Sequence, residues 1–189
     1  ETGVVGLSVA LVDSDGVILQ DGFGYRDPAK TQPATADTPS SIGSVSKTMT
    51  AAMIMQLVAE GKLDLDAPPN ASLPGFAIQQ RFPASAPISL RSVLAHHSGL
   101  PGDLFNGAFS TIPIERWNDY VLGSIAQEYT QRPVGEMWAY NNSGYVVLQN
   151  VIEAAGGLSL ADYSHRSLFG PAGMERSTFG NDAPGLSAT

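Results

Sequence analysis

The stretch that decides the fold is Ser44-Val-Ser-Lys-Thr-Met-Thr-Ala-Ala-Met-Ile-Met-Gln-Leu-Val-Ala-Glu-Gly61. After its first turn this stretch is apolar on nearly every face, interrupted only by Gln56, and the pattern predicts a buried helix rather than a surface helix. Gly61 supplies a stop signal at the C-terminal end. The polar residues gather at the other end, where Ser44 precedes Lys47 by three positions. A buried helix that begins with a hydroxyl and an amine needs a reason for burying them.

Ser44 and Lys47 share one face of a helix because they are three residues apart. A serine hydroxyl becomes a good nucleophile when a neighbouring base takes its proton, and a lysine whose charge is disfavoured by burial can be that base. The free N–H groups of a helix N-terminus favour the negative charge of an oxyanion. The alternative is a capped helix, in which Ser44 is the N-cap and the Lys47 side chain extends into solvent.

The composition limits the possible functions. The chain has 189 residues, of which 43% are hydrophobic and 15% charged, as in one packed domain or part of a larger one. Its net charge of −8 argues against nucleic acids and anionic membranes as partners, because both bind basic surfaces. The absence of cysteine excludes disulfides and thiolate chemistry. No apolar run approaches the ~18 residues that span a bilayer, and the first residues lack the basic segment of a signal peptide.

The N-terminal part of the sequence predicts a β-hairpin. Val4–Val12 is typical of a buried strand, Asp13–Gly16 of a turn, and Val17–Tyr25 of a second strand. Gly22 and Gly24 weaken the second strand and are typical of a bulge. An isolated two-stranded hairpin is only marginally stable in water, so further strands are expected from residues outside this chain.

The rest of the sequence predicts helices joined by long loops. Beyond Gly61 the helical segments are expected at Ser89–His96, with Ser89 as N-cap, and at Ile114–Gln127, Ser143–Ala155 and Ser159–Phe169. The order of elements predicts an α+β fold. We expect residues 1–43 to form the hairpin and loop of a sheet domain, and residues 44–189 to form a mainly helical part.

A second polar cluster lies in the segment Trp138-Ala-Tyr140-Asn141-Asn142-Ser143, which precedes a helix and contains the only Y-x-N sequence in the chain. A tyrosine beside a lysine can relay protons, and an asparagine amide can hold a substrate carbonyl or the lysine. The alternative is structural, with Tyr140 packed in the core and Asn142 capping the next helix.

Other candidate sites are weaker. His96, His97 and His165 lack the spacing of metal ligands and have no paired carboxylate, so neither a metal site nor a cofactor is expected. Gly6-Leu-Ser8-Val-Ala10 partly matches the nucleophile elbow of other hydrolases. It lacks the last glycine and lies inside a predicted strand, which favours a structural role for Ser8.

Taken together, Ser44-x-x-Lys47 and Tyr140-x-Asn142 resemble the two leading motifs of the serine β-lactamase and penicillin-binding protein superfamily. The similarity is greatest to its class C β-lactamase, D-alanyl-D-alanine carboxypeptidase and family VIII esterase branch. The sequences from Ile42 to Thr50, Ser92 to Pro101, Pro133 to Tyr145 and Phe169 to Met174 also resemble segments of that branch, in the same order.

The resemblance implies a β-lactamase/transpeptidase-like fold, with a helical domain on an antiparallel sheet with flanking helices. It implies that Ser44 is the acylated nucleophile, that Lys47 and Tyr140 handle protons, and that Asn142 positions the substrate carbonyl. The expected function is hydrolysis of a small-molecule ester, a β-lactam or a peptide through an acyl-enzyme. The alternative is a penicillin-recognising sensor or binding protein that is acylated without turnover.

A third motif of this superfamily, K-T-G or H-x-G, is expected more than a hundred residues after the tyrosine and is not in the chain. His97-Ser98-Gly99 fits H-x-G literally, but it precedes Tyr140. We therefore expect this chain to be the N-terminal part of the fold, completed by a C-terminal segment or a second chain. By resemblance, the protein is expected in the periplasm or secreted.

Overall fold

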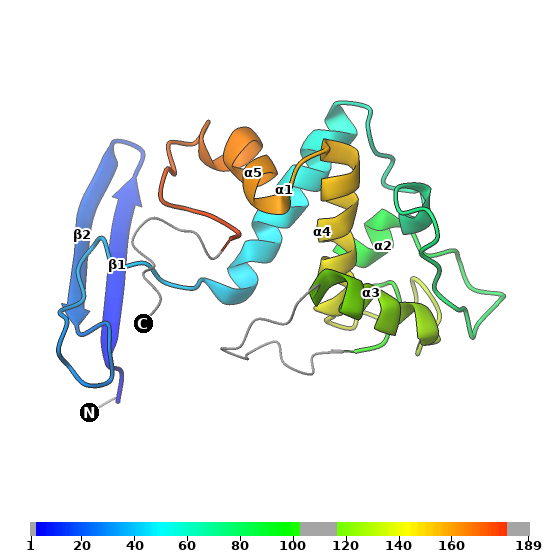
Figure 1. Cartoon of the computed structure of the whole chain (residues 1–189), viewed down its shortest axis with the longest axis horizontal. Coiled ribbons are helices and arrows are strands. Elements are labelled where there is room, and N and C mark those ends of the chain that lie inside the picture. The colour runs from blue at the N-terminus through cyan, green and yellow to red at the C-terminus, as the bar shows by residue number, and fades with distance from the viewer. Residues whose placement is uncertain (1–2, 103–116, 181–189) are drawn as a thin grey trace. The chain divides into compact units, whose positions relative to one another are not determined.

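The computed structural model describes residues 3–102 and 117–180. The chain forms two compact units, one ending at Gly43 and the other beginning at Ser44. The first unit contains a β-hairpin and the second contains the helices (Figure 1). Among the described residues, no helix is long and apolar enough to cross a membrane.

The first unit confirms the predicted hairpin. Strands β1 (Gly6–Asp13) and β2 (Gly16–Gly24) pair antiparallel, and Asp13 lies opposite Gly16 across a tight turn. The Asp13 carboxylate accepts hydrogen bonds from the backbone N–H of Asp15 at 2.8 Å and of Gly16 at 3.1 Å. The turn is therefore closed by its own aspartate, as expected for an Asx turn.

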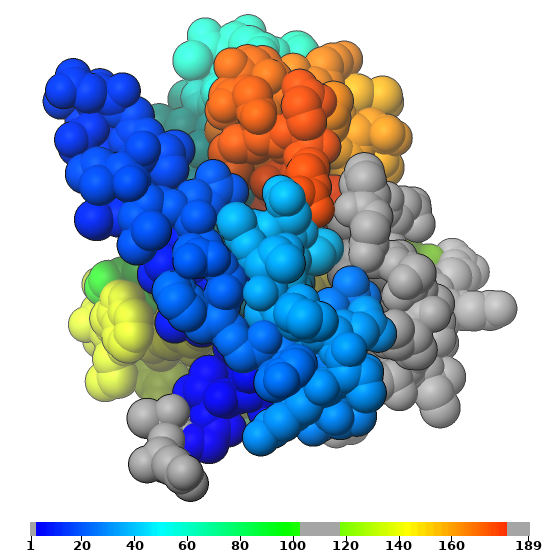
Figure 2. Space-filling view, turned by 90° about the vertical axis from the view of Figure 1, so that its left-hand side faces the viewer, coloured from blue at the N-terminus to red at the C-terminus, as the bar shows by residue number. Residues whose placement is uncertain are grey.

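The predicted bulge at Gly22 and Gly24 is wrong, because the irregular pairing lies near the turn instead. Leu11 pairs with Leu19 but Val12 pairs with Val17, so β2 carries one extra residue there. Gly22 has a different reason to be glycine. A Cβ atom at Gly22 would lie 2.4 Å from backbone atoms of Thr35, in the segment that follows the hairpin. Figure 2 shows that segment, in lighter blue, against the strands.

The prediction that Val4–Val12 is a buried strand is also wrong for this chain. In each strand every residue but one is exposed, and Ile18 retains 60% of its accessible surface. The reason is that the sheet has only two strands among the described residues, so its apolar side chains have few neighbours. Exposed apolar side chains on a two-stranded sheet are expected where further strands and packed elements complete the sheet.

Helix α4 (Ser143–Gly156) is the centre of the second unit (Figure 1). Helices α1 (Ser46–Ala59), α2 (Leu90–Leu94), α3 (Trp117–Gln127) and α5 (Leu160–Ser164) all pack against it. The core residues with no accessible surface are Met53, Ile54, Leu57, Val121, Ile125, Val147, Leu148, Val151 and Ile152. The predicted Ser143–Ala155 helix is confirmed. It ends at Gly157, which adopts the left-handed conformation expected of a C-terminal glycine.

Helix α1 is buried on one face rather than on nearly every face, which corrects the prediction. Its buried residues are Thr50, Met53, Ile54 and Leu57, all on the side that packs against α4, whereas Met55 is 48% exposed. The helix begins at Ser46 and is preceded by a 3-10 turn, Gly43–Val45. Apolar composition shows which faces can be buried, but the neighbouring elements decide which faces are.

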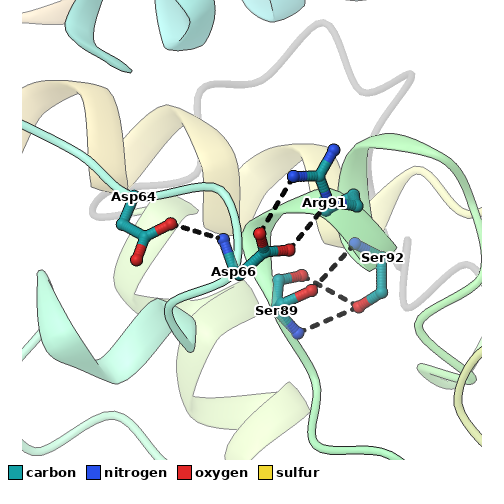
Figure 3. Close-up of polar contacts among 5 residues, drawn as sticks. All are labelled: Asp64, Asp66, Ser89, Arg91 and Ser92. Atoms are coloured by element: carbon teal, nitrogen blue, oxygen red, sulfur yellow. Dashed lines mark hydrogen bonds and ion pairs between the residues drawn. The ribbon is translucent and has the colours of Figure 1, made fainter.

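Helix α2 has the predicted N-cap. The Ser89 hydroxyl accepts from the backbone N–H of Ser92, and the Ser92 hydroxyl accepts from the backbone N–H of Ser89, which is a capping box (Figure 3). Arg91 donates two hydrogen bonds to the Asp66 carboxylate, at 2.7 and 3.0 Å. Both partners are exposed, so this pair orients α2 on the preceding loop more than it stabilises the fold.

The remaining predicted helices are confirmed with small changes. The segment Ser159–Phe169 forms α5, capped by Ser159, followed by one π-helical turn, His165–Phe169. This turn lies beside α1, where the Gln56 amide donates to the carbonyl of Ser167 at 2.9 Å. Helix α3 ends at Gln127 as predicted. The predicted start of that helix, at Ile114, lies outside the described residues.

We predict that Gly99→Ala destabilises the protein much more than Gly61→Ala. Both glycines have left-handed φ angles, +65° and +71°, which cost an alanine about 1–2 kcal/mol. A Cβ atom at Gly99 would also lie 2.2 Å from the carbonyl oxygen of Arg132, whereas one at Gly61 would meet nothing within 4 Å. We therefore expect a loss of about 3 kcal/mol or more for Gly99→Ala in urea unfolding of the full-length protein. Equal losses in the two variants would contradict this explanation.

Candidate active site

The Lys47 amine is the centre of the candidate site. Its Nζ atom lies 3.1 Å from the Ser44 hydroxyl and donates to the Asn142 side-chain oxygen at 2.5 Å. The same atom lies 4.8 Å from the centre of the Tyr140 ring. The structure therefore brings together all four residues that the sequence singles out, although Asn142 is 95 positions from Lys47 in the chain.

The structural alternatives for these residues do not fit the geometry. Helix α1 has Val45 at its N-cap and no side-chain cap, so Ser44 does not cap it. The half-buried Lys47 side chain turns inward to Ser44 and Asn142 rather than out to solvent. Asn142 occupies the N-cap position of α4 but makes no side-chain capping bond there. Tyr140 is 42% exposed and so is not a core residue.

His96 holds the loop that carries Tyr140. Its carbonyl accepts a hydrogen bond from the backbone N–H of Ala139 at 2.8 Å, and its Nδ1 atom accepts from the backbone N–H of Asn141 at 3.1 Å. The His96 and Tyr140 rings are tilted by 36°, with centres 4.6 Å apart. From the sequence, the His96 side chain is considered only as a metal ligand, a role that its spacing argues against, so the contact with the Tyr140 loop comes from the structure.

The pKa of His96 lies below its ordinary value of 6.5. Burial of the imidazole is the main cause, and the positive charge of Lys47 and the neighbouring His97 add to it. At neutral pH the imidazole is therefore uncharged. Because Nδ1 accepts from a backbone N–H, the ring proton is on Nε2.

Asn141 fixes the start of α4 and is 4% exposed. Its amide nitrogen donates to the carbonyls of Leu100, at 3.3 Å, and Pro101, while its oxygen accepts from the backbone N–H of Gly144 at 2.6 Å. These bonds join the turn after α2 to the first turn of α4. The sequence gives one signal for this role, which is a pair of asparagines just before a helix.

Tyr145 is a second aromatic neighbour of Lys47 that the sequence does not single out. Its ring centre lies 5.3 Å from the Lys47 Nζ atom, and its hydroxyl donates to the carbonyl of Leu94 at 3.0 Å. Burial, followed by the nearby Tyr140, raises the pKa of Tyr145 above 10.0. Tyr145 is therefore uncharged at neutral pH, and its ring lines the site beside Lys47.

Within residues 3–102 and 117–180, no group of three or more His, Asp or Glu side chains is close enough to hold a metal ion. His165 instead lies 3.3 Å from the Glu175 carboxylate.

Comparison with known proteins identifies what this chain is similar to. The family model described as Beta-lactamase matches residues 1–189. Protein flp of Staphylococcus aureus is 28% identical over 176 residues, which are 93% of this chain and 35% of that protein. The chain therefore spans about a third of the length of this curated relative.

Two solved structures share the fold. The octameric penicillin-binding protein homologue from Pyrococcus abyssi is 30% identical with a TM-score of 0.78, and the match covers 95% of this chain and 41% of that one. The D-amino acid amidase from Ochrobactrum anthropi, solved with L-phenylalanine, is 27% identical with a TM-score of 0.78, covering 96% and 49%. The chain thus corresponds to less than half of each of these folds.

We predict that Asn141→Ala destabilises the protein by about 2–3 kcal/mol, because it leaves the Gly144 N–H and two carbonyls without their buried partner. Asn150→Ala is the matched control. The Asn150 amide donates to the Val146 carbonyl one turn earlier in its own helix, so its loss is expected to stay below about 1 kcal/mol. Urea unfolding of the two variants in the full-length protein measures both values. A smaller loss for Asn141→Ala than for Asn150→Ala would refute the assignment.

Proposed function

Because the chain belongs to the Beta-lactamase family, we propose that it carries the nucleophile and the general base of a serine hydrolase that works through an acyl-enzyme. The observation that carries the proposal is the position of the Lys47 amine, 3.1 Å from the Ser44 hydroxyl and bonded to Asn142. A base within hydrogen-bond reach of a hydroxyl is the basic requirement for activating a serine.

The Asn142 contact supports a role for Lys47 as the base. A neutral amine has two N–H bonds and one lone pair. When the Asn142 oxygen accepts one of the N–H bonds, the lone pair can face the Ser44 hydroxyl and accept its proton. In this proposal Asn142 orients the amine, and by the same amide it positions the substrate carbonyl.

The proposed reaction has two halves. The Ser44 oxygen attacks the substrate carbonyl carbon while its proton passes to Lys47, and the carbonyl oxygen becomes an oxyanion. The backbone N–H of Ser44, just before α1, stabilises that oxyanion. The bond to the leaving group then breaks, and the leaving group takes the proton from Lys47 through Tyr140. Water hydrolyses the resulting ester and restores the Ser44 hydroxyl.

The substrate class is proposed as a carboxylic ester, an amide or a β-lactam, each of which presents a carbonyl to Ser44. The similarity to a D-amino acid amidase and to a penicillin-binding protein homologue supports this range. We also propose that a further segment or a second chain completes the sheet, because the apolar residues of β1 and β2 are exposed. Acylation without turnover, as in a sensor, is distinguished from catalysis by the first experiment below.

We predict that Ser44→Ala abolishes covalent labelling of the full-length protein by a fluorophosphonate or β-lactam probe. Intact-mass measurement would show one probe per protein in the parent and none in the variant. Ser46→Ala is the control, because Ser46 is only two residues from Ser44, whereas the Lys47 amine bonds to Ser44 and Asn142. Labelling that persists in Ser44→Ala would refute the proposed nucleophile. With a chromogenic ester, steady turnover after the burst indicates an enzyme, and a burst alone indicates a sensor.

We predict that Lys47→Ala and Tyr140→Phe each slow acylation by about 100-fold or more, the usual effect of losing a general base. The loss in the double variant should be far smaller than the product of the two, because both residues serve one proton path. Lys62→Ala and Tyr129→Phe are matched controls, because they remove the same groups away from the site. Lys62 pairs with Glu60, and the Tyr129 ring lies beside Arg81. If either site variant acylates at the parent rate, that residue is not in the proton path.

A further inference from the structure

One residue, His96, contacts the chain on both sides of Tyr140. Its carbonyl accepts from Ala139 N–H at 2.8 Å and its Nδ1 from Asn141 N–H at 3.1 Å, while its ring lies against the Tyr140 ring. We propose that His96 is a positioning residue of the reaction, which sets Tyr140 and Asn142 in place around Lys47. This inference rests on the function proposed above for Ser44 and Lys47.

The backbone at His96 supports a role for its side chain. His96 follows the end of α2 with a φ of +61°, in the left-handed position where helices usually end with glycine or asparagine. A histidine there is strained compared with glycine. A histidine at this position is explained if its imidazole makes a contact that glycine cannot provide, and the hydrogen bond that Nδ1 accepts from the Asn141 N–H is such a contact.

The contacts leave little freedom to Tyr140. Hydrogen bonds to His96 fix the residues before and after it, and the imidazole covers one side of its ring. The Lys47 amine lies 4.8 Å from the centre of the same ring. Loss of the imidazole would release the backbone at Asn141, and with it the adjacent Asn142 amide that holds Lys47. Small displacements of catalytic groups cost large factors in rate, so a positioning residue acts on the rate more than on binding.

The acceptor role requires an imidazole without a proton on Nδ1. The titratable groups that face it are Lys47 on α1, Tyr145 on α4, Tyr140 on the loop and His97 on its own segment. Protonation would place an N–H on Nδ1 opposite the Asn141 N–H and add a positive charge near Lys47. Because the pKa of His96 lies below 6.5, the contact is intact at neutral pH and is lost on acidification through that pKa.

The test compares His96→Gly, His96→Asn and the control His97→Asn in the full-length protein. Glycine relieves the left-handed backbone but removes the acceptor, whereas asparagine tolerates that backbone and keeps a side-chain acceptor. The measurements are the maximal rate constant of Ser44 labelling by a fluorophosphonate probe, the half-saturating probe concentration, and the melting temperature. We expect His96→Gly to lower the maximal rate constant by about tenfold or more, with half-saturation changed by less than about threefold and no loss of melting temperature.

The two other variants complete the comparison. We expect His96→Asn to recover most of the lost rate and His97→Asn to label within about twofold of the parent protein, because the His97 Nδ1 lies against the carbonyl of Ala95 in its own turn and not against the Tyr140 loop. Below pH 6.5 the labelling rate of the parent should fall more steeply than that of His96→Asn, which cannot titrate at this position.

Parent-like labelling by His96→Gly, or identical pH profiles of the parent and His96→Asn, would overturn the inference. If His96→Gly fails to fold, the pH comparison decides alone. Failure here is distinguishable from failure of the proposed function: labelling that persists in Ser44→Ala overturns the nucleophile itself. Loss of labelling in Ser44→Ala with a normal His96→Gly overturns only the role of His96.

Discussion

The hydrogen bond between Lys47 and Asn142 joins the first turns of two helices, and the rest of the site depends on it. Lys47 lies on α1 and Asn142 at the start of α4, and these helices pack against each other through side chains without accessible surface. The core therefore sets the distance between the two polar ends. Burial of Met53, Ile54 and Leu57 on one side, and of Val147 and Val151 on the other, has a direct chemical consequence, because it determines what the amine can reach.

Around this bond, tyrosine rings and hydrogen-bonding groups take the place of the aliphatic side chains of the core. The Lys47 amine lies against the rings of Tyr140 and Tyr145, 4.8 and 5.3 Å from their centres. The Tyr145 hydroxyl is bonded to the carbonyl of Leu94, which keeps its ring in place. The site is thus built from neutral groups around a single amine. An uncharged imidazole at His96 fits the same arrangement, because burial lowers the pKa of His96.

Much of this structure follows from the sequence, and the exceptions have physical causes. The hairpin, the capping role of Ser89 and the helix after Asn142 are all predicted, because each depends on residues within a few positions in the sequence. Burial of β1 and of all faces of α1 is predicted wrongly, since it depends on which elements lie opposite. The bond from Asn141 to His96 and the bonds from the Asn141 amide to Leu100 and Pro101 join residues 40 or more positions apart, so no local pattern reveals these contacts. The meeting of Ser44, Lys47, Tyr140 and Asn142 is anticipated only through resemblance to a family.

The contacts between the turn after α2 and the loop before α4 have a consequence for how this protein can vary. Backbone N–H groups of Gln131, Gly135 and Ala139 donate in succession to carbonyls of Gly99, His97 and His96, each at 2.8 Å. The number of residues between these donors is therefore fixed by the spacing of the acceptors. A single insertion or deletion within residues 131–141 would carry Tyr140 and Asn142 out of alignment with Lys47. Changes in length that alter substrate range without disabling the chemistry belong elsewhere, for example in the long proline-rich loop between α1 and α2.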